Sequence, residues 1–290
     1  MNTKVFMFYS YKGGSGRTVS SGNVAAALAK HGKRVMVIDM DFEAPGLHNV
    51  FDVSESDKYQ NTLGIQDYLK GSVALEEVSD EMVIDMGSEK EVKGGALPIK
   101  DGGKLLYLMA SPKTTPVAFN SEKPQLYAKM IDLKRYFSEE ENLDYIILDS
   151  ASGIREAFSL PMSISNELMI FFRWTRQHFE GTCKVLSLWK FHDDLSDGQE
   201  SIKLPNVHLI ASAVPKSAEL DSLENKQLAK ELRKLHEDNK QTLTKSFGPK
   251  GKLLFEIPEL IELKWQESII VFDKENNPYD DIAFRIMGLH

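Results

Sequence analysis

The chain has 290 residues, of which 42 % are hydrophobic and 27 % are charged, an ordinary composition for one large or two small globular domains. Its formal net charge of −8 argues against non-specific binding to DNA, because such binding relies on a positive surface. Cys183 is the only cysteine, which excludes an internal disulfide and a metal or cluster site built from several cysteines of one chain. The single cysteine fits a reducing compartment, so we expect a cytoplasmic protein. No run of about 18 apolar residues occurs, so we expect no stable membrane insertion.

Short apolar strands and helical segments alternate in the first part of the chain. Residues 5–9 are β-branched, aromatic or otherwise apolar, as in a buried strand. Residues 18–31 carry Ala and Leu at helical spacing and are followed by Gly32, a common helix stop. Residues 34–39 predict a second continuous apolar strand.

The segment 50–102 has a weaker pattern. Residues 64–70 and 74–82 resemble short helices, and residues 87–103 form a polar, glycine-containing stretch typical of a loop. Residues 104–111 predict a third strand. Residues 123–137 predict an amphipathic helix, with one apolar side made of Leu126, Met130, Leu133 and Phe137.

Four more strands are expected, at residues 144–149, 167–174, 206–214 and 252–258. Continuous apolar strands that alternate with helices indicate a parallel sheet covered on both faces. We therefore expect an α/β fold, doubly wound, with a mostly parallel sheet of about seven strands and helices on both faces. We expect one domain over residues 1–290, with additions at about 50–102 and 217–250.

A glycine-rich loop follows the first strand, with the sequence Lys-Gly-Gly-Ser-Gly-Arg-Thr at residues 12–18. Its glycines allow backbone N–H groups to approach an anion, and the following helix adds its positive end. Arg17 would neutralise phosphate oxygens and the Thr18 hydroxyl would hold Mg²⁺. The general pattern G-x-x-x-x-G-K-[ST] is not met, because Tyr11 replaces the first glycine and Arg17 the lysine. The chemistry alone leaves two interpretations open, a phosphate-binding loop and an ordinary turn between a strand and a helix.

The loop resembles the deviant Walker A sequence K-G-G-x-G-[KR]-[ST] of the ParA/MinD family of P-loop ATPases. Residues 35–47, 144–154 and 254–269 resemble further segments of that family in the same order. The resemblance implies a P-loop NTPase fold of the SIMIBI type that uses ATP and Mg²⁺. It assigns nucleotide binding to the loop and the start of the helix, namely Gly13, Gly14, Ser15, Gly16, Arg17, Thr18 and Val19.

The resemblance also implies roles for residues outside the loop. Lys12 and Asp41 would be catalytic, Lys12 by reaching the nucleotide of a partner subunit and Asp41 by orienting the attacking water. Mg²⁺ would be held by Thr18, Asp39 and Asp149. Nucleotide binding would further involve Gly153, in a segment that responds to the γ-phosphate, and Pro215, in the base-binding loop.

The implied function is an ATP-binding and ATP-hydrolysing switch that forms an ATP-dependent homodimer and controls a protein partner, with slow turnover. Arg17 and the sequence Asp-Ser-Ala-Ser at 149–152 depart from the more usual family pattern. They motivate an alternative, a nucleotide-sensing scaffold with little or no hydrolysis. A DNA-positioning ATPase of the partition type is a further alternative, made less favoured by the acidic composition.

Three other features carry weaker expectations. Residues 217–245 are highly charged with interspersed leucines, which predicts a surface helix or helix pair or, alternatively, a partner-binding helix. Arg173, Arg176 and His178 cluster at the end of the predicted strand 167–174, in either a polar loop or a loop that contacts phosphate or a partner. The tryptophans are expected to pack in cores or between helices; they are Trp174, Trp189 and Trp265.

Overall fold

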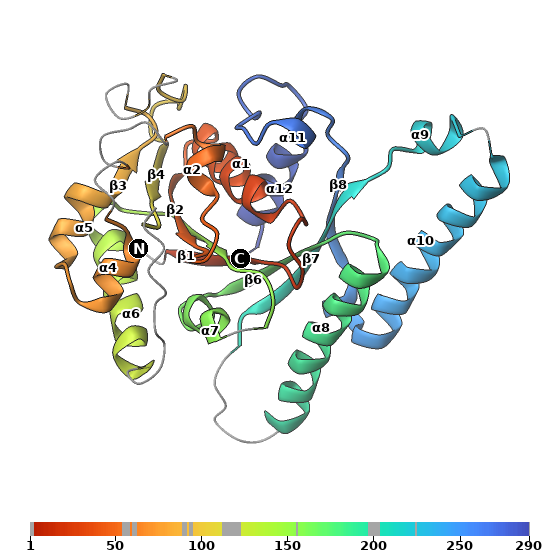
Figure 1. Ribbon diagram of the computed structural model, residues 1–290, viewed down its shortest axis with the longest axis horizontal. Helices are drawn as coiled ribbons and strands as arrows, with labels where there is room; N and C mark the ends of the chain where they lie inside the picture. Colours follow the sequence, from red (N-terminus) through yellow and green to blue (C-terminus); the bar gives the residue numbers. More distant parts are fainter. Residues whose placement is uncertain are drawn as a thin grey trace.

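A single sheet of eight strands organises the computed structural model, which describes residues 3–53, 59, 63–88, 92, 95–111, 123–154, 156–196, 204–223 and 225–289 (Figure 1). The strand order is β3-β4-β2-β5-β1-β6-β7-β8, and all neighbours are parallel except β3 and β4. The strands are β1 Lys4–Tyr9, β2 Arg34–Met40, β3 Val83–Asp85, β4 Lys104–Leu108, β5 Tyr145–Ser150, β6 Glu167–Phe172, β7 Asn206–Val214 and β8 Leu253–Pro258.

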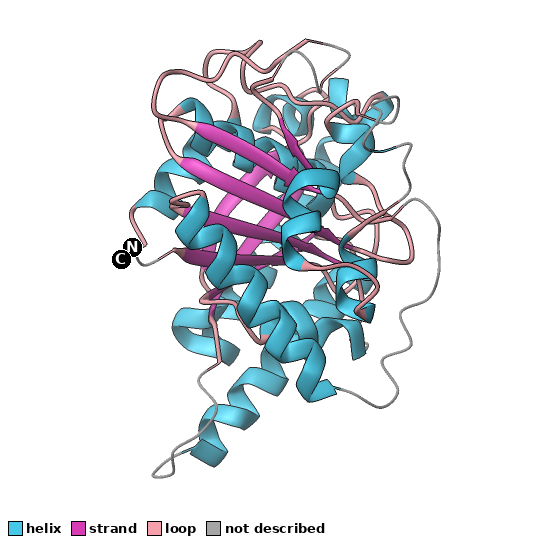
Figure 2. Cartoon of the chain, turned by 90° about the vertical axis from the view of Figure 1, so that its left-hand side faces the viewer, coloured by secondary structure: helices cyan, strands magenta, loops and turns pink. Residues whose placement is uncertain are grey.

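Helices cover both faces of this sheet (Figure 2). Consecutive residues of β1 show why, since Phe6 and Phe8 belong to one buried cluster and Met7 and Tyr9 to another. The helices are α1 Arg17–Lys30, α2 Leu47–Val50, α4 Ile65–Lys70, α5 Leu75–Met82, α6 Lys123–Glu140, α7 Glu156–Met162, α8 Arg176–Ser196, α9 Ser217–Asp221, α10 Lys226–Phe247, α11 Glu262–Trp265 and α12 Pro278–Met287, with a 3₁₀ turn at Gly248–Gly251.

The predicted α/β class and the mostly parallel sheet of about seven strands are confirmed, and the sheet has one strand beyond the seven that were located in the sequence. The additional strand is β3, which directly follows α5 and pairs antiparallel with β4 at the edge of the sheet. It has only three residues, too few to show an apolar repeat, so pairing with β4 rather than sequence pattern defines it. The apolar side predicted for α6 is confirmed, because Leu126, Met130, Leu133 and Phe137 are all buried.

The charged segment after β7 forms a helix pair, α9 and α10. Helix α10 lies beside α8 at the β7–β8 side of the sheet (Figure 1). Its leucines Leu228, Leu232 and Leu235 remain 40–54 % exposed. The predicted surface helix pair is therefore present, and the partner-binding role stays a prediction.

The three tryptophans have different environments. Trp189 is buried and its indole donates to the carbonyl of Pro205, and Trp174 packs edge-on against Phe172. Trp265 is 89 % exposed, so the expectation that it packs in a core was wrong. It ends the single-turn helix α11, none of whose residues is buried.

The last helix, α12, packs on α1. Its residues Tyr279, Ile282, Ala283 and Ile286 are buried against the core, and Asp280 accepts from Lys30 at 2.9 Å near the end of α1. The apolar pattern near the C-terminal end of the sequence is thus used for internal packing. No helix in the described ranges is both long and apolar enough to cross a membrane.

Gly103 provides a test of the packing that holds α1 against the sheet. A Cβ atom at this position would lie 2.2 Å from the carbonyl oxygen of Ala29 in α1. We predict that Gly103→Ala lowers the free energy of unfolding by about 2 kcal/mol, because backbone would have to move away from backbone. Urea unfolding measures the change.

Gly288→Ala is the matched control, since its new Cβ would make only ordinary contacts at 3.5 Å or more. A Gly103→Ala protein as stable as the control would contradict the close packing of these two backbones.

Candidate functional site

The glycine-rich loop joins the carboxyl end of β1 to the first turn of α1. Gly14 and Gly16 have φ values of 77° and 74°, a left-handed conformation that favours glycine. Gly16 is the N-cap of α1, and no side chain caps the helix there. The N–H groups of the first turn therefore remain available to an anion at the positive end of the helix.

Two contacts from other parts of the chain fix the loop. The ring of Tyr11 lies against Gly181 of α8, where a Cβ would be only 2.0 Å from a ring carbon. The hydroxyl of Ser212 in β7 donates to the carbonyl of Ser15 at 2.6 Å. Strand β7 and helix α8 thus determine where the loop lies relative to the sheet edge.

Arg17 is the buried cation of the site. Its Nε donates to Asp149 Oδ1 at 2.9 Å, and its terminal nitrogen donates to Asp41 Oδ2 at 3.0 Å. Burial lowers the pKa of Arg17, but the charges of Asp149 and Asp41 outweigh this effect and raise it overall. Arg17 therefore connects the loop to two of the three aspartates selected from the sequence.

Asp39 organises the segment that follows β2. It is fully buried, and its carboxylate accepts backbone N–H groups from Asp41, Gly46 and Leu47 at 3.1–3.2 Å. Burial, and then the charge of Asp149, raise the pKa of Asp39. These bonds wrap residues 41–47 around one carboxylate, so Asp39 shapes the loop that carries Asp41.

Asp149 and Thr18 supply oxygen atoms to the same region. Asp39 and Asp149 are directly paired in the register of β2 and β5. Asp149 Oδ1 accepts from Arg17 and from the hydroxyl of Ser21, whereas its buried Oδ2 has no hydrogen-bond partner in the described part of the chain. A buried carboxylate oxygen without a partner, near a threonine hydroxyl, fits the donor chemistry that Mg²⁺ prefers.

The second loop selected from the sequence contacts the first. Gly153 has a φ of 85° and its N–H donates to the carbonyl of Ser10 at 3.1 Å. A Cβ on Gly13 would lie 3.9 Å from the hydroxyl of Ser152. Lys12, by contrast, is exposed and makes no hydrogen bond or ion pair with any described residue.

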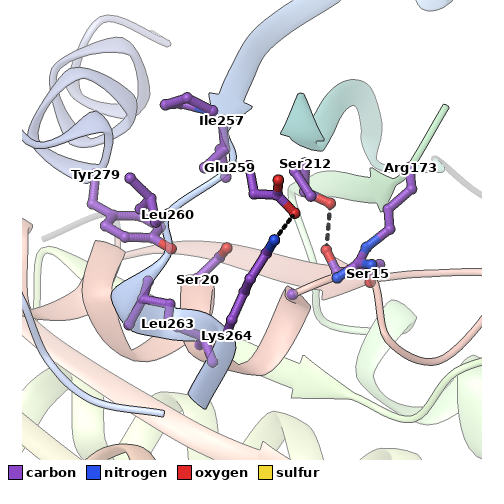
Figure 3. Close-up of a pocket in the computed structure, with 14 residues that line it drawn as sticks. Ser15, Ser20, Arg173, Ser212, Ile257, Glu259, Leu260, Leu263, Lys264 and Tyr279 are labelled. Atoms are coloured by element: carbon purple, nitrogen blue, oxygen red, sulfur yellow. Dashed lines mark hydrogen bonds and ion pairs between the residues drawn. The ribbon is translucent and has the colours of Figure 1, made fainter. Parts of the chain in front are cut away.

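A cavity of about 240 Å³ opens beside the loop (Figure 3). Its walls come from the loop, the start of α1, the ends of β7 and β8 and the segment up to α11; they include Ser15, Gly16, Val19, Ser20, Arg173, Ser212, Pro258, Glu259, Lys264 and Tyr279. Ala213 also lines it and has a φ of 51°, at the irregular end of the β7–β8 ladder. The cavity thus extends from the glycine-rich loop into a partly apolar recess.

The structure brings the glycine-rich loop and the selected aspartates together at one edge of the sheet, whereas Pro215 lies outside the cavity. The loop, Asp39, Asp41, Asp149 and Gly153 meet at one edge of the sheet. Pro215 is exposed and does not line the cavity, whereas Pro258 does. Sequence reasoning missed Pro258, Glu259 and Lys264 as candidate site residues, although the Ile-Pro sequence that ends β8 indicated the place.

A phosphate-type loop at the first strand of a parallel α/β sheet, with carboxylates at the neighbouring strand ends, defines a P-loop nucleotide-binding protein. The profile of the AAA_31 family, described as AAA domain, matches residues 3–202. The chain belongs to this family and is of the ParA/MinD-like type of P-loop ATPase.

Individual comparisons agree with this assignment. The septum site-determining protein MinD of Synechocystis is 29 % identical over 167 residues, which are 58 % of this chain and 52 % of that protein. The chain spans about half the length of the curated relatives it matches.

Solved structures resemble the fold over nearly the whole chain. The MinC:MinD cell division complex of Aquifex aeolicus gives a TM-score of 0.63 at 22 % identity, covering 99 % of this chain and 97 % of that chain. MinD complexed with Mg-ADP from Pyrococcus horikoshii gives 0.60 at 18 % identity, covering 98 % and 94 %. At these identities the similarity establishes the fold.

The bridge formed by Arg17 is testable without nucleotide. Arg17→Met would leave the carboxylates of Asp41 and Asp149 without their cation, and Asp149 is fully buried. We predict a loss of about 3 kcal/mol in the free energy of unfolding at pH 7, measured by urea denaturation without nucleotide.

Adding Asp149→Asn to Arg17→Met removes one of the unpaired charges and is expected to recover part of this loss. Equal stability of the wild type and Arg17→Met would show that the ion pairs do not form in solution.

Proposed function

We propose that this protein is a Mg²⁺-dependent ATPase whose nucleotide cycle controls binding to another protein. The observation that carries this proposal is the convergence of Arg17, Asp41 and Asp149 at the N-terminus of α1, beside a cavity of about 240 Å³. Mg-ADP in the MinD of Pyrococcus horikoshii and MinC in the Aquifex complex support the nucleotide and the kind of partner.

The phosphate chain is assigned to the loop, Gly13–Gly14–Ser15–Gly16, and to Thr18 and Val19. Arg17 now contacts carboxylates, so its guanidinium must turn toward phosphate oxygens when a nucleotide enters. This exchange releases Asp41, whose carboxylate then is free to orient a water molecule for attack on the γ-phosphate.

Thr18 and Asp149 are the residues that would hold Mg²⁺, with Asp39 behind them as the carboxylate that orders residues 41–47. The ion supplies charge neutralisation to the β- and γ-phosphate oxygens when it is bound. The described residues contain no group of three or more His, Cys, Asp or Glu arranged to hold a metal ion. A site of this kind needs phosphate oxygens as additional ligands, as Mg²⁺ sites commonly do.

We assign Lys12 and Gly153 to the conformational change that accompanies ATP binding and hydrolysis. Lys12 is exposed at the loop and without a partner among the described residues, as expected of a cation that contacts the nucleotide of a second subunit. Gly153 links the end of β5 to the loop through its bond to Ser10. We infer that each subunit is one domain and that two subunits close around ATP in the cytoplasm. Helix α10 is the candidate surface for binding a different protein.

A scaffold that senses nucleotide without hydrolysing it is the second candidate. It is favoured by the ion pair between Arg17 and Asp41, because Asp41 cannot orient an attacking water while this pair persists. Both candidates predict ATP binding, and only the first predicts turnover that depends on Asp41.

We predict that Asp41→Asn lowers phosphate release from Mg-ATP by roughly 10²-fold or more while ATP still binds, because an amide orients water poorly for attack. The assay measures phosphate release at several protein concentrations, with excess EDTA as the metal-free control.

Specific activity that rises with protein concentration is expected if Lys12 acts between subunits, and Lys12→Ala should abolish that rise.

Unchanged phosphate release by Asp41→Asn would contradict a role for Asp41 in hydrolysis. ATP binding by the wild type without phosphate release would favour the scaffold, and failure to bind ATP would contradict both candidates.

A further inference from the structure

Arg173 is a cation at the nucleotide cavity to which no role has yet been given. It directly follows β6, is exposed, and lines the same cavity as Ser15 and Gly16. Figure 3 shows its side chain running from the end of β6 toward Ser15. It forms no hydrogen bond or ion pair within the described ranges, although the chain carries a net charge of −8.

The carboxylates around the cavity are already engaged. Asp41 and Asp149 pair with Arg17, and Glu259 pairs with Lys264 at 2.8 Å across the cavity wall (Figure 3). The guanidinium of Arg173 is therefore not engaged by a carboxylate of the described residues, and it lines the same cavity as Gly16, the N-cap of α1. Two positive groups at one cavity, whose lining carboxylate Glu259 is already paired with Lys264, are the arrangement expected of an anion site.

The environment of His178 indicates that positive charge gathers near the end of β6. His178 is 9 % exposed in the first turn of α8, and its pKa is lowered by burial and then by the charges of Arg173 and Lys12. Both cations are thus close enough to act on one imidazole from the loop side. Lys12 does not line the cavity, so of these two cations Arg173 is the one directed into it.

Arg176, the remaining basic residue of the segment 173–178, is not part of the cavity. Arg176 is exposed and pairs with Glu180 one helical turn later, at 2.7 Å. It does not line the cavity. The structure thus divides a segment that looked uniformly basic in the sequence into a cavity residue, a buried histidine and a surface ion pair.

We propose that Arg173 binds the phosphate chain of the nucleotide held by its own subunit, as a second arginine opposite Arg17. The proposal rests on the proposed nucleotide binding and adds a phosphate ligand from the end of β6. A planar guanidinium with several N–H donors matches phosphate oxygens, and its exposed position lets it approach after the nucleotide has entered. The ligand class is a nucleoside di- or triphosphate, and adenosine is not expected to depend on Arg173.

The test is isothermal titration calorimetry of ATP, ADP and adenosine in the presence of Mg²⁺. We predict that Arg173→Ala binds ATP and ADP roughly tenfold to a hundredfold more weakly than the wild type, the effect of losing a hydrogen bond to a charged group. Arg173→Lys should recover part of the affinity. Arg176→Ala is the matched control, equal in charge change and three residues away, and should bind as the wild type does.

Equal weakening by Arg173→Ala and Arg176→Ala would overturn the proposal, since a general loss of positive charge would then explain the effect. Unchanged ADP affinity in Arg173→Ala would also overturn it, even if dimer formation were weaker, because Arg173 would then serve the partner's nucleotide. In both cases the wild type still binds ATP and the proposed function stands, whereas a wild type that binds no nucleotide would defeat both. Matching circular dichroism spectra confirm that the variants are folded.

Discussion

The contact between one buried arginine and two aspartates is the interaction around which the site is built. The register of β2 and β5 places Asp39 beside Asp149 at the carboxyl edge of the sheet. Carboxylates gathered in a buried environment repel one another and require a cation. Arg17 provides it for Asp149 and Asp41, and backbone N–H groups stabilise Asp39 instead. Under the proposed function, a bound nucleotide would draw Arg17 away from these carboxylates, and Mg²⁺ would take its place beside Asp149.

Contacts from distant parts of the fold hold the glycine-rich loop at this edge of the sheet. Tyr11 packs on Gly181 of α8 and Ser15 is bonded to Ser212 of β7, so elements more than 150 residues away in sequence fix the loop. Helix α1 is in turn held by the close approach of Gly103 and by Asp280 of α12. These contacts join the glycine-rich loop to α8 and β7, and α10, which packs beside α8, exposes its leucines on that side of the sheet.

Much of the fold was predictable because its signals are local. Three of the predicted strands, at residues 5–9, 104–111 and 167–174, contain apolar runs of five or more residues, and α6 showed its apolar side in its repeat. The three-residue strand β3 was not predictable, because only its pairing with β4 makes it a strand. Trp265 was misjudged for a related reason, since an aromatic residue is buried only if a neighbouring element covers it, and no residue of α11 is buried.

The sequence by itself determined the α/β class, the glycine-rich loop and the aspartates at the strand ends, because each depends on residue types at short spacing. Only the tertiary structure decided how these groups are used. It paired Arg17 with Asp41 and Asp149, set Pro258 rather than Pro215 at the cavity, and turned Arg173 toward it while Arg176 joined Glu180. Those outcomes depend on strand order and on the packing of distant helices, which bring together side chains that no local pattern connects.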